Sequence, residues 1–175
     1  MTAEIMATDK DETQWCDGLH PIHIATRSGH IKGMQEQVDQ GVSVELRTND
    51  HELDTPLILA SRYSTLLDAV KWLLHHKAIV NAVDYIGASS LIRAAYAGNV
   101  DIVKTLLEFK ADTTLCISHG ENKGRTALEI ARHFGRTDVV RVLEEVAAIA
   151  AAPPAPPAPN PFNATVAHIK PSALL

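Results

Sequence analysis

The sequence predicts an all-α fold in which short helical hairpins stack side by side along one axis. One type of segment occurs four times, and the residues that open its first helix lie 35, 34 and 37 residues apart: His20, Thr55, Ser89 and Thr126. Each copy holds two short apolar stretches around a turn, and such a unit buries its apolar faces only against neighbours of its own kind. Aromatic residues make up only 5% of the chain, which suits a stack with a core of Ala, Leu and Val.

The copy at residues 89–112 shows the pattern most clearly. Ser89 can accept a backbone N–H bond at a helix start. Leu91 and Ala94 give this helix an apolar side, and Gly98 can adopt the left-handed conformation that ends it. The apolar residues of a second helix follow at helical spacing: Val100, Val103, Leu106 and Leu107.

The pattern divides the chain into a lead-in, a repeat domain at 15–150 and a tail. The segments are an acidic, flexible N-terminal stretch (1–14), four repeats (15–49, 50–83, 84–116 and 121–150) and a Pro/Ala-rich segment (151–175). Polar residues in the second helix of repeat one and near the end of repeat four suit solvent-facing ends of a stack.

Repeats one and two depart from the pattern at three positions. His20 stands where Ser or Thr opens the other first helices, and Leu53 occupies the usual turn glycine position. Ser64 replaces the glycine between the two helices of repeat two, and the spacing places one extra residue in the turn 63–65. We expect unusual local geometry at these positions within the same overall fold.

The connection between repeats three and four, 116–125, is longer than the others and consists of turn-forming or polar residues. Long surface loops cost little stability and are frequent sites of recognition.

The tail at 151–175 is rich in proline and nearly uncharged, which favours an extended polyproline II conformation as far as Pro159. At ~3.1 Å per residue its reach is ~75 Å, so it can lie along its own domain or tether a partner. Asn160, Pro161 and Phe162 are similar to the tripeptide that EH domains read.

Composition and charge narrow the classes of function and the cellular locations that we expect for this chain. The net charge of −5 makes nucleic-acid binding unlikely, and no apolar run is long enough to span a membrane. The acidic N-terminus resembles neither a secretory signal nor a transit peptide. With only two cysteines, a reducing compartment is expected. We therefore expect a cytoplasmic protein, with the nucleus as the alternative.

Nine histidines raise the question of catalysis or metal binding. His75 and His76 are adjacent and point in different directions from a helix, and no Cys or carboxylate follows them at the spacing of a metal site. No nucleophile elbow, phosphate loop or paired-carboxylate motif is present. We expect structural or surface histidines, no catalytic residue, no metal and no cofactor.

The repeat period near ~33 residues and the pattern T-P-L-H-x-A resemble the ankyrin repeat. The pattern is seen in Thr55-Pro56-Leu57-Ile58-Leu59-Ala60 and extends from about Trp15 to Ala147. The resemblance implies an ankyrin solenoid of helix–turn–helix units joined by β-hairpins or loops. It also implies binding rather than catalysis. In this family, partners usually meet the concave face, which consists of the hairpin loops and the exposed side of each first helix.

Counting from the alanine that ends each motif places a set of side chains on this face. They are Arg27, Arg62, Tyr63, Arg93, Tyr96, His133 and Phe134, with Tyr85 and Ile86 at a hairpin tip. Arginine and aromatic residues dominate binding hot spots, so a groove of this kind would favour an acidic or aromatic-bearing peptide. The alternative is that these residues are scattered over the surface or pack between repeats.

The leading hypothesis is a non-catalytic adaptor or scaffold that binds proteins through its concave face and, in part, its tail. The alternative is a permanently bound subunit of a large multiprotein assembly. The sequence identifies neither the partner nor the surface that binds it.

Overall fold

A computed structural model of the chain describes residues 18–151. The predicted lead-in, the tail from residue 152 and the tripeptide at 160–162 lie outside these residues. The helices in this range are α1 (Pro21–Arg27), α2 (Ile31–Asp39), α3 (Pro56–Ser61), the short 3₁₀ helix η2 (Ser64–Leu66), α4 (Leu67–His75), α5 (Ser90–Ala97), α6 (Val100–Glu108), α7 (Ala127–His133) and α8 (Thr137–Ala151).

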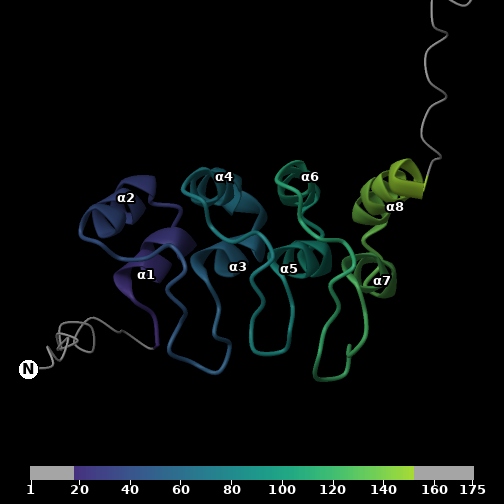
Figure 1. Cartoon of the computed structure of the whole chain (residues 1–175), viewed down its shortest axis with the longest axis horizontal. Coiled ribbons are helices and arrows are strands. Elements are labelled where there is room, and N and C mark those ends of the chain that lie inside the picture. The colour runs from purple at the N-terminus through teal and green to yellow at the C-terminus, as the bar shows by residue number, and fades with distance from the viewer. Residues whose placement is uncertain (1–17, 152–175) are drawn as a thin grey trace, which may run out of the picture.

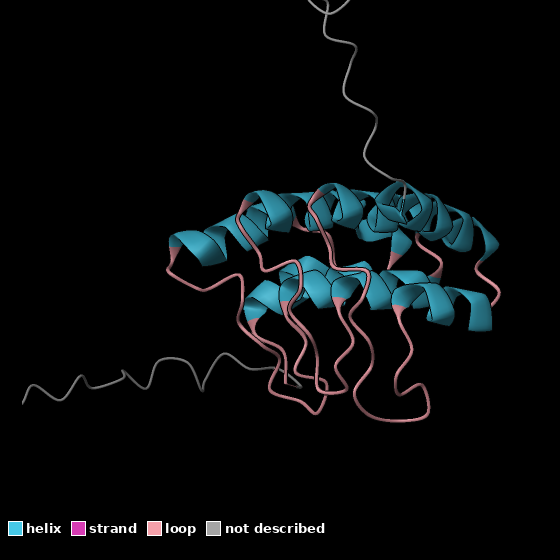
Figure 2. Ribbon diagram, turned by 45° about the vertical axis from the view of Figure 1, so that its right-hand side comes forward, coloured by secondary structure: helices cyan, strands magenta, loops and turns pink. Residues whose placement is uncertain are grey.

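The first helix of each pair, α1, α3, α5 and α7, lies in one layer, and α2, α4, α6 and α8 lie in the other (Figure 1). The connecting loops extend from the first layer, away from the second (Figure 2). This arrangement confirms the predicted all-α ankyrin-type stack. None of the helices within residues 18–151 has the length and apolarity that crossing a membrane requires.

All four predicted capping residues open their helices. The side chains of Thr55, Ser89 and Thr126 accept bonds from backbone N–H groups at the starts of α3, α5 and α7. His20 does the same for α1 through Nδ1, at 3.5 Å from the Ile22 nitrogen. An imidazole nitrogen therefore replaces a hydroxyl at the cap of repeat one.

Small residues on the first helices let the repeats pack closely. Ala60, Ala94 and Ala131 are fully buried and belong to one continuous core. Leu73 and Leu106 fill the space between the layers and are also fully buried. The packed alanines explain how the chain builds a core with so few aromatic residues.

The turns between paired helices follow the glycine pattern except in repeat two. Gly29, Gly98 and Gly135 have φ of 69°, 81° and 66°, the left-handed region that glycine adopts without strain. Repeat two has the short 3₁₀ helix η2 at this place, directly after Tyr63 in an extended conformation. The extra residue predicted in this turn is thus accommodated by a change of backbone structure.

The loops are less regular than the predicted hairpins. Within the described residues there is no β-strand, and isolated antiparallel bridges join Val83 to Ser89 and Cys116 to Thr126. Leu53, at the usual glycine position, has φ of 51° and remains 43% exposed. The loops are therefore held by single bridges and side-chain bonds in place of strand ladders.

A charged pair covers the last described repeat. Arg132 on α7 lies 2.7 Å from Glu144 on α8, and both side chains are about half exposed. Arg132 occupies the position that Thr26, Ser61 and Ala95 fill in the earlier repeats, where all three are fully buried. A large, charged side chain at this position gives repeat four an outer side that faces solvent.

Candidate protein-binding face

The predicted binding residues lie on the first-helix layer and its loops. Arg27 and His133 end α1 and α7, while Arg62 and Phe134 directly follow α3 and α7. The others are Tyr63 after α3, Tyr85 and Ile86 in the loop before α5, and Arg93 and Tyr96 on α5. Their use by a partner stays a prediction, but their environments differ sharply.

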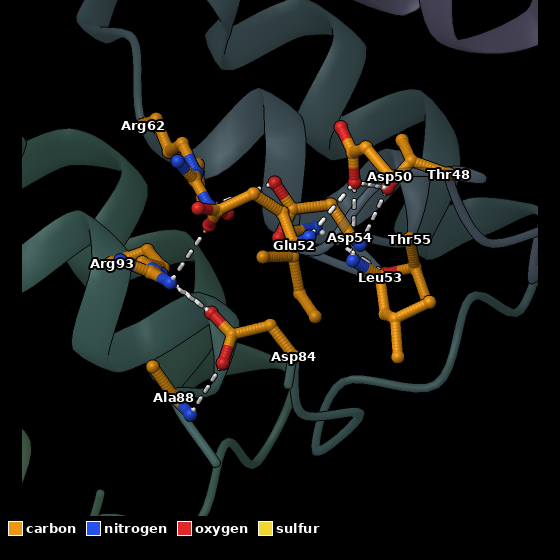
Figure 3. Close-up of polar contacts among 12 residues, drawn as sticks. Thr48, Asp50, Glu52, Leu53, Asp54, Thr55, Arg62, Asp84, Ala88 and Arg93 are labelled. Atoms are coloured by element: carbon orange, nitrogen blue, oxygen red, sulfur yellow. Dashed lines mark hydrogen bonds and ion pairs between the residues drawn. The ribbon is translucent and has the colours of Figure 1, made fainter. Parts of the chain in front are cut away.

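Two of the arginines are already paired with carboxylates of the chain (Figure 3). Nη2 of Arg62 lies 2.8 Å from both Glu52 Oε2 and Asp54 Oδ2. Nη2 of Arg93 pairs with Asp84 Oδ2 and lies 3.5 Å from Glu52 Oε2. We call these five residues the arginine–carboxylate cluster. The protein's own acids therefore already neutralise the two arginines, and the contact of these arginines with a partner's carboxylates stays a prediction.

The cluster holds three carboxylates and two guanidinium groups, so one negative charge is in surplus. Asp54 carries this imbalance. Its burial raises its pKa to about 6, although Arg62 and Arg93 pull in the opposite direction. Burial also opposes the charge of Arg62, but its bonds to Glu52 and Asp54 raise its pKa above the usual value. The arginine stays charged, while the buried Asp54 holds its proton more tightly than an ordinary aspartate.

The acids of the cluster are positioned by the loops. Asp84 Oδ1 accepts N–H bonds from Ile86 and Ala88, at 3.0 and 2.9 Å, which leaves Oδ2 for Arg93. Asp50, at the equivalent position of the preceding loop, accepts N–H bonds from Glu52 and Leu53. Its burial opposes ionisation, but these bonds and one from Thr48 lower its pKa.

The predicted site residues do not include these acids, although Asp50, Glu52 and Asp84 stand at the predicted hairpin tips. The signal that identifies Asp50 and Asp84 is local: each is an aspartate five residues before the helix cap, where its side chain can close the turn. No local signal pairs Asp84 with Arg93, because that contact depends on how α5 packs against its loop.

A hollow of about 390 Å³ opens on this face between repeats one and two. Its charged walls come from Arg27, Asp50, Glu52, Asp54 and Arg62. The other lining residues are Leu19, Ile24, Thr48, Leu59 and Tyr63. We call this space the concave hollow. It brings the predicted residues Arg27, Arg62 and Tyr63 together.

Aromatic side chains occupy the far half of the same face. Tyr96 is 49% exposed, and its ring packs edge-on against Phe134 with centroids 4.6 Å apart. Phe134 also meets His133 edge-on at 4.8 Å. Three of the predicted residues, Tyr96, His133 and Phe134, therefore form a contiguous group that links α5 to the end of α7. Tyr63 lies separately, beside the hollow.

The two residues at the loop tip have different roles. The N–H of Tyr85 donates to the Glu52 carbonyl at 3.1 Å, while its side chain is 49% exposed. The Ile86 carbonyl accepts N–H bonds from Ser118 and His119, and its side chain is half-buried against the core. Tyr85 is available to a partner, whereas Ile86 joins adjacent loops.

Repeat one contains two fully buried histidines, and the ring of His23 has a structural role. His23 Nδ1 accepts the His20 N–H at 3.1 Å, and Nε2–H donates to the Leu46 carbonyl at 2.8 Å. Burial lowers the pKa of His23, in agreement with the neutral ring that these two bonds require. No group of three or more His, Cys, Asp or Glu within residues 18–151 is placed to hold a metal ion.

Comparison with known proteins agrees with this architecture. A family model described as "Ankyrin repeats (3 copies)" matches residues 2–84. A second, described as "Ankyrin repeats (many copies)", matches residues 63–107 and 91–144. Together the matches cover both halves of the repeat domain.

Three curated proteins illustrate the relationship. An ankyrin repeat protein of fowlpox virus is 26% identical over 69% of this chain. The mouse B-cell lymphoma 3 protein homolog is 30% identical over 71%, and an Arabidopsis thaliana protein named as an E3 ubiquitin-protein ligase, XBAT34, is 39% identical over 67%. This chain spans 45%, 27% and 30% of their respective lengths. The stacked helix pairs, the repeat pattern and these matches show that the chain belongs to the ankyrin repeat family, whose repeats are protein–protein interaction modules.

Proposed function

We propose that this chain is a non-catalytic adaptor that holds another protein on its concave face. The exposed tyrosines beside and beyond the concave hollow carry this proposal. Tyr63 and Tyr96 are 46% and 49% exposed, and large aromatic side chains at a concave surface are characteristic of binding hot spots. Of the acidic or aromatic-bearing peptide expected from the sequence, we therefore keep the aromatic-bearing one as the proposed partner segment.

The environment of the titratable groups supports binding rather than catalysis. The acids and arginines of the arginine–carboxylate cluster are satisfied mainly by one another, so they are poorly placed to exchange protons with a substrate. Ankyrin repeats are typically non-catalytic. The ligase named among the relatives is a longer protein, of which this chain covers only 30%.

Affinity capture with mass spectrometry tests the proposal in three forms of the full chain. They are the natural protein, the double variant Tyr63→Ala with Tyr96→Ala, and the matched control Ile149→Ala. Ile149 is a 70% exposed apolar residue on α8, in the other layer. We expect the double variant to lose the main partner and the control to keep it. Retention of every partner by a correctly folded double variant would refute the concave-face proposal.

An adaptor and a permanent subunit differ in how their partners exchange. Adding excess unlabelled chain to the captured complex should release an adaptor within minutes to hours, whereas a permanent subunit should stay bound. We expect exchange. We also propose a cytoplasmic or nuclear location, which fluorescence imaging of the tagged full chain would test.

A further inference from the structure

The concave hollow is lined by more negative than positive charge. Asp50, Glu52 and Asp54 face it together with Arg27 and Arg62. The two carboxylates nearest to Arg62 already neutralise it, whereas Asp50 has no ion-pair partner among the described residues. Arg27 likewise has no ion-pair partner among the described residues, so the five charged groups that line the hollow leave one negative charge in surplus.

A buried acceptor provides a second, independent observation. Asp54 lines the hollow, its side chain is only 4% exposed, and its Oδ1 has no hydrogen-bond partner in the described part of the chain. A desolvated carboxylate oxygen without a donor is energetically costly. A cationic group in the hollow would stabilise this buried carboxylate electrostatically, whereas another carboxylate would destabilise it.

The other lining residues, apart from Thr48, are apolar or aromatic. Ile24 is 42% exposed and Tyr63 46% exposed, and the remaining two are Leu19 and Leu59. A long side chain with a charged end can bury its methylene stem against such side chains while its head approaches the carboxylates. The hollow thus combines apolar side chains with a surplus of carboxylates.

We propose that the concave hollow receives a lysine or arginine side chain, next to an apolar residue, from the protein partner. This inference rests on the proposed function and gives the partner's binding segment a chemistry opposite to the acidic one expected from sequence. An acidic segment would compete with Glu52 and Asp54 for Arg62, and displacement would leave a buried carboxylate unpaired. A basic segment leaves those pairs in place.

Selection from a displayed library of random peptides tests the proposal on the full-length chain. Peptides that bind the natural protein but not the Tyr63→Ala, Tyr96→Ala variant occupy the concave face. We expect these peptides to be enriched in Lys or Arg beside an apolar residue. Enrichment in Asp or Glu, or no preference for charge, would overturn the inference but leave the proposed function intact. Failure to select any peptide that depends on the tyrosines would count against both.

Single charge changes then locate the basic side chain, with affinities measured by fluorescence anisotropy for one selected peptide. We expect Glu52→Gln to weaken binding about tenfold and Arg27→Gln to strengthen it about threefold. Glu108→Gln makes the same charge change as Glu52→Gln at an exposed position on α6 and should have no effect. Weaker binding in Arg27→Gln would indicate an acidic ligand and contradict the proposal.

The tail of the chain is the competing occupant, because it carries Lys170 next to Ile169. Zero-length crosslinking of amines to carboxylates, followed by mass spectrometry of the monomer, distinguishes the two. We expect no crosslink from Lys170 to Asp50 or Glu52 within one chain. Such a crosslink would assign the hollow to the tail and overturn its assignment to a partner.

Discussion

Nη2 of Arg62 lies 2.8 Å from Oδ2 of Asp54, a carboxylate whose side chain is only 4% exposed. The same nitrogen lies 2.8 Å from Glu52, which is 38% exposed. One guanidinium group thus connects a buried acid to a solvent-facing one. Loss of the arginine would leave Asp54 buried without a counter-charge, which is far more costly than loss of a surface pair.

We predict that Arg62→Met lowers the free energy of unfolding by about 2–3 kcal/mol at pH 7. The value is below that of a fully buried pair because the Arg62 side chain is 27% exposed. Urea denaturation followed by circular dichroism measures the change. Arg141→Met is the control, because Arg141 and Asp138 are 77% and 70% exposed and such pairs contribute less than about 1 kcal/mol. Equal losses in both variants would contradict the importance of burial.

The pH dependence of stability should reveal Asp54. Its pKa is about 6 in the folded chain, above its ordinary value of 3.8. Between these values the folded state binds a proton that the unfolded state has released, so stability falls as pH rises toward about 6. Relative to Asp54→Asn, which cannot titrate, the natural protein should lose about 2 kcal/mol between pH 4 and pH 7. Parallel stability curves for the two proteins would show that Asp54 titrates normally.

Leu53 allows a test of backbone strain. Its φ of 51° is in the left-handed region, and the equivalent residues Gly18, Gly87 and Gly124 also have positive φ. We predict that Leu53→Gly leaves stability unchanged or raises it by up to about 1 kcal/mol. Leu53→Val should lower it by about 1–2 kcal/mol, because a β-branched side chain fits this region poorly. Thermal melts compare the two, and a more stable valine variant would refute the assigned conformation.

The core should respond strongly to truncation at Leu106. This side chain is fully buried on α6, so Leu106→Ala should cost about 2–5 kcal/mol through lost burial and a residual cavity. Ile149→Ala, at a 70% exposed position, should cost less than about 0.5 kcal/mol. Chemical denaturation of both variants gives the comparison. A melt unmoved by Leu106→Ala would mean that the helical register is wrong.

The features that could be predicted from sequence depend on local rules. The four helix caps, the glycine turns and the extra residue before α4 follow from what a short stretch of backbone needs. Leu53 stands where the repeat pattern predicts a turn glycine, and it has the positive φ that this position requires. Periodicity specified the helices because each apolar residue needs a neighbour at a fixed spacing.

The arginine–carboxylate cluster could not be predicted in the same way. Glu52 and Arg93 are 41 residues apart, and their contact depends on how two repeats pack. The repeat spacing places Arg62 and Arg93 on the first-helix layer, but no local pattern shows that acids of the loops pair with them. The loops between the repeats also depend on side chains, because Asp50 and Asp84 accept backbone N–H bonds where no strand ladder is formed.

The position of Glu52 affects the order in which the protein opens. Glu52 belongs to repeat two but reaches Arg93 in repeat three, and Asn99 Nδ2–H donates to the Ser61 carbonyl across the same boundary at 3.1 Å. Such contacts strengthen one nearest-neighbour interface of the stack. We expect repeats two and three to open together rather than independently. A ligand that spans the concave hollow would also hold repeat one against repeat two, so occupancy would lengthen the lifetime of the folded chain.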